Sequence, residues 1–76
     1  MSIFDISDFG CEVTSVTYDL QRQTGHVRMP AGNCTDMDLT VKYFVDQIPG
    51  IQHIITWCDG EVDTQYITHE NKWIAI

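Results

Sequence analysis

Basic residues are scarce in this 76-residue chain. Arg22, Arg28, Lys42 and Lys72 stand singly against eleven aspartates and glutamates, so the formal net charge is −7. Proteins that bind nucleic acid or an anionic membrane need clustered positive charge to neutralise phosphates. The composition therefore argues against direct binding to nucleic acid or to a membrane surface. It favours association with a basic surface on another protein.

Closely spaced cysteines are also missing. Cys11, Cys34 and Cys58 lie more than twenty residues apart, and an odd number of dispersed cysteines is a poor disulfide framework. No apolar run approaches the ~20 residues of a membrane span. Asp5 and Asp8 stand where a secretory signal would carry positive charge. These features predict reduced thiols and a cytoplasmic location.

The remaining composition is that of a globular protein, with 43% hydrophobic and 20% charged residues. The chain contains no internal repeat and no linker-like segment, so residues 1–76 are predicted to form a single small acidic α+β domain. A domain of this size buries only about 60% of its unfolded surface. It therefore has little interior for both a core and a substrate chamber.

The first half of the chain predicts two strands. Residues 12–18 are rich in β-branched and aromatic types, and residues 26–29 return as a second strand that Pro30 ends. The polar stretch 19–25 is predicted to turn the chain, with Gly25 available for a positive φ.

A helix is the clearest local prediction. Thr35 is the expected N-cap, acidic residues follow in the first turn, and Pro49 and Gly50 end the helix. Apolar residues recur at helical spacing over a stripe about 100° wide, which is the width of a core-facing surface. The predicted stripe consists of Met37, Val41, Phe44, Val45 and Ile48.

A hairpin follows the helix. Asp59 and Gly60 are a strong two-residue turn signal, and the turn pairs Cys58 with Glu61 and, further out, Trp57 with Val62. Continued in register, the core face is predicted to hold Ile51, His53, Ile55, Trp57, Val62, Thr64, Tyr66 and Thr68. Residues 73–76 read as a short last strand.

The predicted fold class is therefore α+β, with the element order β-β-α-β-β-β. We expect an antiparallel sheet of about five strands with one helix packed on one face. The other face of the sheet is expected to face mostly water.

Catalytic and metal-binding patterns are weak. Cys34 precedes the helix, where the helix dipole stabilises a thiolate, but no signature of a catalytic family surrounds it. His26, His53 and His69 do not stand at the spacings that hold structural zinc. We therefore expect no enzyme activity, no catalytic residues, no metal and no cofactor.

Two surfaces are candidates for binding a partner. In the hairpin, Asp59, Glu61 and Asp63 stand at alternate positions, and Glu61 and Asp63 would lie about 6.7 Å apart at the rise of a strand. This spacing is close to two phosphate steps of about 3.4 Å along one DNA strand. The alternative is that these acids protect an exposed hairpin from edge-to-edge pairing.

The second candidate surface lies on the outer side of the predicted helix. Leu39 and Tyr43 form an apolar pair there, with Asp36 and Asp46 beside them, which is typical of an aromatic anchor with a charged rim. The alternative is that the sheet curls, or that the apolar N-terminal segment folds over, and that this pair is buried. That segment contains Ile3, Phe4, Ile6 and Phe9.

Small size, strong acidity and missing catalytic motifs together resemble the profile of phage-encoded anti-defence proteins, including anti-CRISPR and anti-restriction DNA mimics. The resemblance implies a non-enzymatic inhibitor that occupies a basic, nucleic-acid-binding surface of a partner protein in the host cytoplasm. The alternative is a homo-oligomeric structural or accessory module. In such a module Trp73 and Ile76 of the last strand would pair across a two-fold axis, for example in a homodimer.

Overall fold

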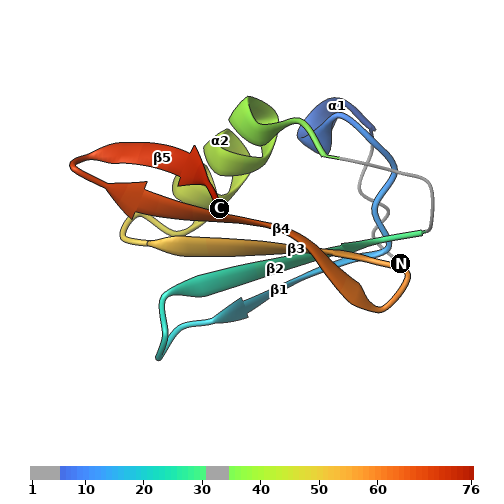
Figure 1. The fold of residues 1–76 in the computed structure, drawn as a ribbon, viewed down its shortest axis with the longest axis horizontal. Helices are drawn as coiled ribbons and strands as arrows, with labels where there is room; N and C mark the ends of the chain where they lie inside the picture. The colour runs from blue at the N-terminus through green and yellow to red at the C-terminus, as the bar shows by residue number, and fades with distance from the viewer. Residues whose placement is uncertain (1–5, 31–34) are drawn as a thin grey trace.

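One mixed sheet with a helix on one face makes up the part of the chain that the computed structural model describes, residues 6–30 and 35–76 (Figure 1). The elements in chain order are α1 (Ile6–Phe9), β1 (Ser15–Asp19), β2 (Thr24–Met29), α2 (Met37–Gln47), β3 (His53–Cys58), β4 (Glu61–His69) and β5 (Lys72–Ala75). The strands lie in the spatial order β1-β2-β3-β4-β5. The predicted α+β class is therefore confirmed, as is the predicted order of the five strands and the main helix along the chain.

The pairing of the two central strands differs from the prediction. β2 and β3 are parallel, whereas the other neighbouring strands are antiparallel. The chain leaves the end of β2, returns along α2 and enters β3 at the end of the sheet where β2 began (Figure 1). A helical crossover of this kind joins parallel neighbours, whereas a short turn joins antiparallel ones. The sheet is thus mixed.

Helix α2 begins one residue later than predicted. Asp36, and not Thr35, is the N-cap, and its carboxylate accepts a hydrogen bond from the Leu39 N–H at 3.0 Å. The Thr35 hydroxyl instead lies 3.3 Å from the hydroxyl of Tyr66. The helix ends at Gln47, ahead of Pro49, as predicted.

The buried face of α2 is turned relative to the predicted stripe. Phe44 is fully buried as expected, but Val45 is 38% exposed, and Thr40, which was not in the stripe, is fully buried. The hydroxyl of Thr40 donates to the Asp36 carbonyl at 2.7 Å, so its burial leaves no unpaired polar atom. Phe9, with its ring centroid 6.2 Å from that of Phe44, packs on α2 as well. Packing against α1 shifts the buried face toward Thr40.

Strand β3 presents the opposite face to the core from the one predicted. Ile54 and Thr56 are fully buried, whereas His53, Ile55 and Trp57 are half-buried on the side away from α2. The first two predicted pairs, Cys58 with Glu61 and Trp57 with Val62, are correct.

A β-bulge next to those pairs causes the inversion. Thr56 pairs with Thr64 rather than Asp63, so Asp63 is an additional residue in β4. The Thr56 hydroxyl accepts from the Thr64 N–H at 2.9 Å and donates to the Thr64 carbonyl at 3.1 Å. This pair of hydrogen bonds allows a threonine to be buried beside the bulge.

Gly25 lies inside β2 and has no positive φ, contrary to the prediction. A side chain at this position would collide with the core, because an added Cβ would stand 2.5 Å from a ring carbon of Phe44. The turn before β2 uses Gln23 at φ 52° instead. Glycine is required in β2 for the close approach of helix α2 to the sheet.

The core lies between the sheet and the two helices. Short helix α1, which the sequence pattern did not predict, supplies Phe9 to it, and the segment between α1 and β1 supplies Cys11 and Val13. The other buried hydrophobic residues are Val27, Met29, Phe44, Ile51, Ile54 and Tyr66. Neither described helix is both long and apolar enough to cross a membrane.

Candidate partner-binding surfaces

The topology gathers negative charge at one end of the sheet. β2 and β3 end there, β4 and β1 begin there, and α1 lies beside them (Figure 1). Backbone hydrogen bonds join these segments, from Asp36 N–H to the Phe9 carbonyl at 2.7 Å and from Asp59 N–H to the Met29 carbonyl at 3.1 Å. We call this the acidic end, and its carboxylates are Asp8, Glu12, Asp36, Asp59, Glu61 and Asp63.

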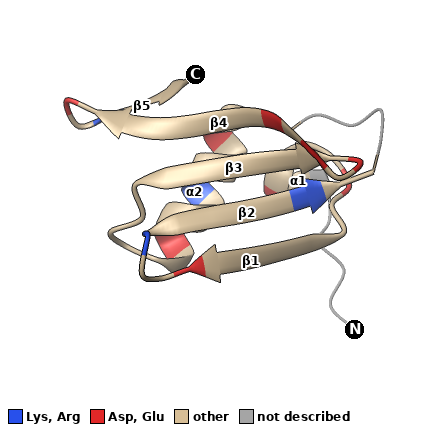
Figure 2. Ribbon diagram, turned by 60° about the horizontal axis from the view of Figure 1, so that its bottom comes forward, with Lys and Arg blue, Asp and Glu red and all other residues tan. Residues whose placement is uncertain are grey.

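The acidic end accounts for most of the net charge. It holds six of the ten carboxylates in residues 6–30 and 35–76, and of the four cationic side chains it holds Arg28 alone. The opposite end of the sheet is balanced, because Asp19 and Glu70 lie there with Arg22 and Lys72 (Figure 2). The chain is therefore polarised along the strand direction.

The β3–β4 hairpin forms the tip of the acidic end. Asp59 and Gly60 both have positive φ, 51° and 83°, as a type I′ turn requires, so the predicted turn is confirmed. Asp59, Glu61 and Asp63 are all exposed. Because Asp63 is the additional residue of the bulge, Glu61 and Asp63 do not follow the regular strand spacing that the DNA comparison assumed.

The structure brings the two predicted surfaces closer together than the sequence indicated. Asp36 caps α2, and its backbone N–H binds α1, so this helix-surface residue belongs to the acidic end with the hairpin residues. The Asp36 carboxylate accepts the capping hydrogen bond of α2, and the residue nevertheless remains exposed to solvent.

The predicted apolar pair on α2 is divided by α1. Tyr43 is half-buried, with its ring centroid 4.7 Å from that of Phe9, whereas Leu39 remains 38% exposed. Part of the N-terminal segment thus covers Tyr43 but leaves Leu39 exposed, so the alternative is correct for Tyr43 alone. The other residues of that segment, Ile3 and Phe4, lie outside the described residues. A shallow hollow of about 290 Å³ remains between the helices, lined by Ser7, Asp8, Leu39, Lys42, Tyr43 and Asp46.

Tyr43 has a structural role that the sequence did not indicate. Burial, and next a hydrogen bond with Tyr43, raise the pKa of Tyr18 in β1 to about 12. Tyr43 therefore connects α1, α2 and β1, and truncating it would disturb the fold as well as the surface.

Asp46 forms an ion pair on the solvent side of α2. Its carboxylate lies 2.7 Å from the ammonium of Lys42, one helical turn earlier, and this hydrogen bond raises the pKa of Lys42. Both side chains are exposed, so the pair contributes little to stability. Asp46 is thus separated from the acidic end and partly neutralised.

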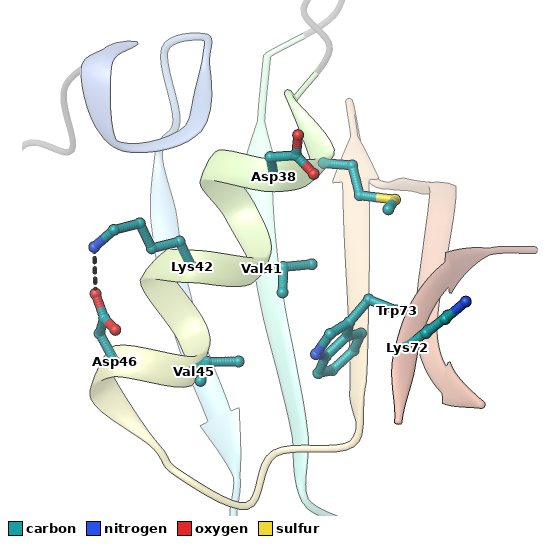
Figure 3. Close-up of a pocket in the computed structure, with 8 residues that line it drawn as sticks. Asp38, Val41, Lys42, Val45, Asp46, Lys72 and Trp73 are labelled. Atoms are coloured by element: carbon teal, nitrogen blue, oxygen red, sulfur yellow. Dashed lines mark hydrogen bonds and ion pairs between the residues drawn. The ribbon is translucent and has the colours of Figure 1, made fainter. Parts of the chain in front are cut away.

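An apolar groove between α2 and β5 was not predicted. Val41 and Val45 line one side, and the indole of Trp73 lies opposite them (Figure 3). Met37 also lines the groove, whose volume is about 520 Å³. The Lys42–Asp46 ion pair borders the groove. The groove exists because a sheet of five strands is wider than one helix can cover. The predicted apolar stripe concerned only the helix and did not indicate how much of the sheet the helix covers.

The sheet face opposite α2 carries a polar and aromatic cluster. Trp57 donates from its indole N–H to Nδ1 of His26 at 3.1 Å, and the guanidinium of Arg28 lies 4.6 Å from the centre of the indole ring. His53 Nε2 lies 2.8 Å from the side-chain oxygen of Gln65. Burial, and next the Arg28 charge, lower the pKa of His26. The sequence did not indicate this cluster, because it predicted that His53 and Trp57 of β3 face the core.

The thiols and histidines form no metal site in the described residues. Cys11 is buried with its sulfur 3.8 Å from that of Met29, and the Cys58 thiol lies 3.5 Å from the Pro30 carbonyl. Cys34, the cysteine considered as a nucleophile, lies outside the described residues, as do residues 31–33.

No protein-family model, curated protein or solved structure matches this chain. Its fold and surfaces are therefore the basis for any functional conclusion.

Proposed function

We propose that this chain is a non-enzymatic binding protein whose acidic end occupies a basic, nucleic-acid-binding surface of a partner protein. The observation that carries the proposal is the polarised charge: six carboxylates and one guanidinium at one end, and balanced charge at the other. A concentrated field of one sign steers a basic partner toward that end. The cytoplasmic anti-defence inhibitors that mimic DNA are the class that this arrangement fits.

The β3–β4 hairpin and helix α2 would both contribute to binding. The exposed hairpin carboxylates would accelerate association and fix its orientation. Leu39, exposed beside Asp36, supplies apolar contact that slows dissociation. Tyr43 contributes less directly than its sequence position suggested, because it packs against Phe9.

The test compares three proteins as bait in a lysate of a candidate host. They are the wild type, a hairpin variant with Asp59→Asn, Glu61→Gln and Asp63→Asn, and a control variant with Asp19→Asn, Asp46→Asn and Glu70→Gln. Each variant loses three charges, so total charge is matched. Retained proteins are identified by mass spectrometry at low and high salt, with and without competing duplex DNA.

The proposal expects a nucleic-acid-binding protein that the wild type and the control variant retain at low salt. High salt, competing DNA or the hairpin variant should each release it, because surface charges are screened beyond about 10 Å at 0.1 M salt. Equal retention by the hairpin and control variants would overturn the proposal. So would a partner whose capture is indifferent to DNA.

A further inference from the structure

The sheet face opposite α2 carries several apolar residues on three neighbouring strands, β3, β4 and β5. Its strands contribute Ile55, Trp57, Val62, Ile67 and Ile74, of which Val62 is 46% and Ile74 39% exposed. We call this surface the open face. Sheets with one solvated face normally alternate apolar and polar residues, with the polar set outside. Here the apolar residues belong to β3, β4 and β5, whereas β1 and β2 present Ser15, Thr17, His26 and Arg28 on this face. The apolar part of the open face is therefore the part formed by β3, β4 and β5.

The polar side chains of the open face already bind one another. Trp57 donates to His26, Arg28 stacks on the indole of Trp57, and His53 bonds to Gln65. Trp57, His26, His53 and Gln65 can be covered without losing these hydrogen bonds, and unsatisfied polar atoms are the main cost of burying polar groups. Stacking does not satisfy the N–H donors of Arg28, which is exposed and needs water or an acceptor on the second copy. The cluster therefore lowers the cost of covering this face.

Charge distinguishes the open face from the rest of the molecule. Figure 2 shows acidic residues at the strand ends and in the turns, while the middle of the described face lacks them. A two-fold axis that lies between two such faces and crosses the strands reverses the ends of the second copy. The acidic end of each copy then lies over the balanced end of the other, where Arg22 and Lys72 lie with Asp19 and Glu70, rather than over a second acidic end.

The available area favours this face over the edge of β5. Five strands at ~4.8 Å and about six residues at ~3.3 Å give a footprint of roughly 480 Å² per copy, or roughly 1,000 Å² for the pair, near the lower limit of a specific interface. Edge pairing through β5 involves only Lys72–Ala75. Trp73 of that strand also points toward the groove beside α2 rather than along the edge (Figure 3).

We propose that two copies of this chain associate through their open faces, sheet against sheet, with strand directions reversed across a two-fold axis. The small footprint predicts a dimer in the micromolar range. In this arrangement the acidic end of each copy lies against the other copy, so a partner that binds the acidic end binds the monomer. Failure of the dimer therefore leaves the proposed partner binding untouched.

Sedimentation velocity from 1 to 300 µM tests the proposal. The diagnostic variant is Val62→Lys with Ile74→Lys, both at exposed positions where a lysine ammonium can reach water in the monomer. Added lysines reduce the net negative charge, so weaker association cannot be ascribed to overall repulsion. The matched control is Val45→Lys with Ile76→Lys, on the groove and near the β5 edge, where exposure is 38% and 65%.

We expect the wild type and the control to dimerise alike, and the diagnostic variant to raise the dissociation constant at least tenfold. Lys72→Glu should also weaken the dimer. Adding Asp63→Lys to that variant should restore the dimer, because the reversed ends place position 63 of one copy near position 72 of the other. A wild type that stays monomeric to 300 µM overturns the proposal, as does a dimer that only the control variant disrupts. Binding of a single-stranded oligonucleotide that the diagnostic variant abolishes would instead assign the face to nucleic acid.

Discussion

The two faces of the sheet use the same strands for different purposes. Toward α2, Val27 and Ile54 are fully buried with Phe44 above them. On the open face, Ile55 and Trp57 are half-buried, and its polar groups bind one another. Burial of apolar area stabilises a fold in proportion to the area removed from water. The helix-covered face therefore carries most of the stability of the monomer, whereas the open face remains accessible.

The largest predicted effect separates the two faces directly. Phe44→Ala should lower the free energy of unfolding by about 3–5 kcal/mol, because it removes a fully buried ring and leaves a cavity. Ile55→Ala, on the open face, should cost about 1 kcal/mol in dilute monomer, since its side chain is only half-buried. Urea unfolding followed by circular dichroism measures both. Equal losses would contradict the division between the faces.

Gly25→Ala should have the next largest effect. The added methyl would stand 2.5 and 2.6 Å from two ring carbons of Phe44, so either the ring or the helix must move. Overpacking of this kind costs about 1–3 kcal/mol. Gly60→Asn is the control, because Gly60 has open space around it and asparagine tolerates its positive φ. A stability equal to that of the wild type would show that α2 does not require this close approach.

Asp36→Ala tests the end of α2 that belongs to the acidic end. Loss of the cap to the Leu39 N–H should cost about 1 kcal/mol. Asp38→Ala removes the same charge from the first turn without removing a cap, so it should cost less, about 0.3–1 kcal/mol. Thermal unfolding at matched ionic strength compares them. A larger loss for Asp38→Ala would refute the assignment of the cap.

The smallest predicted effect concerns pH and the open face. The pKa of His26 is lowered below its ordinary value near 6.5, so the folded protein resists its protonation. As the pH falls below 6.5, the unfolded chain takes up a proton before the folded one does, and stability decreases. The contribution of His26 is complete above pH 6.5.

Urea midpoints at pH 7.5 and 5.5 measure this effect for the wild type and for His26→Gln. The difference between the two midpoints should be smaller in His26→Gln, whose amide can still accept from Trp57. His69→Gln, at an exposed position, serves as the control for histidine replacement. An unchanged pH dependence in His26→Gln would contradict the role of His26.

Local signals in the sequence predicted much of the fold. The Asp59–Gly60 turn, the stop of α2 before Pro49 and the class of the fold all follow from residues that act on their own neighbourhood. The face of β3 did not, because residues 54–58 are apolar or β-branched on both sides and carry no clear alternation. A bulge at Asp63 then decided which set is buried.

The sequence predicted the residues of the candidate surfaces but not how those residues lie relative to one another in space. Asp36 and the hairpin acids are separated by more than twenty positions in the chain, and only the parallel pairing of β2 and β3 places them at one end of the sheet. The sequence also left open whether Tyr43 is buried, because Phe9 of α1 covers it and this four-residue helix is too short to give a periodic signal.

By itself, the sequence determined the strong negative charge, the element order and the turn chemistry, because these depend on composition and on neighbours along the chain. The tertiary structure decided the pairing of β2 with β3, the face of β3 that is buried and the end at which the carboxylates gather. These depend on contacts between distant segments, in which small packing differences, such as Phe44 against Gly25, select one arrangement among several that the local sequence permits.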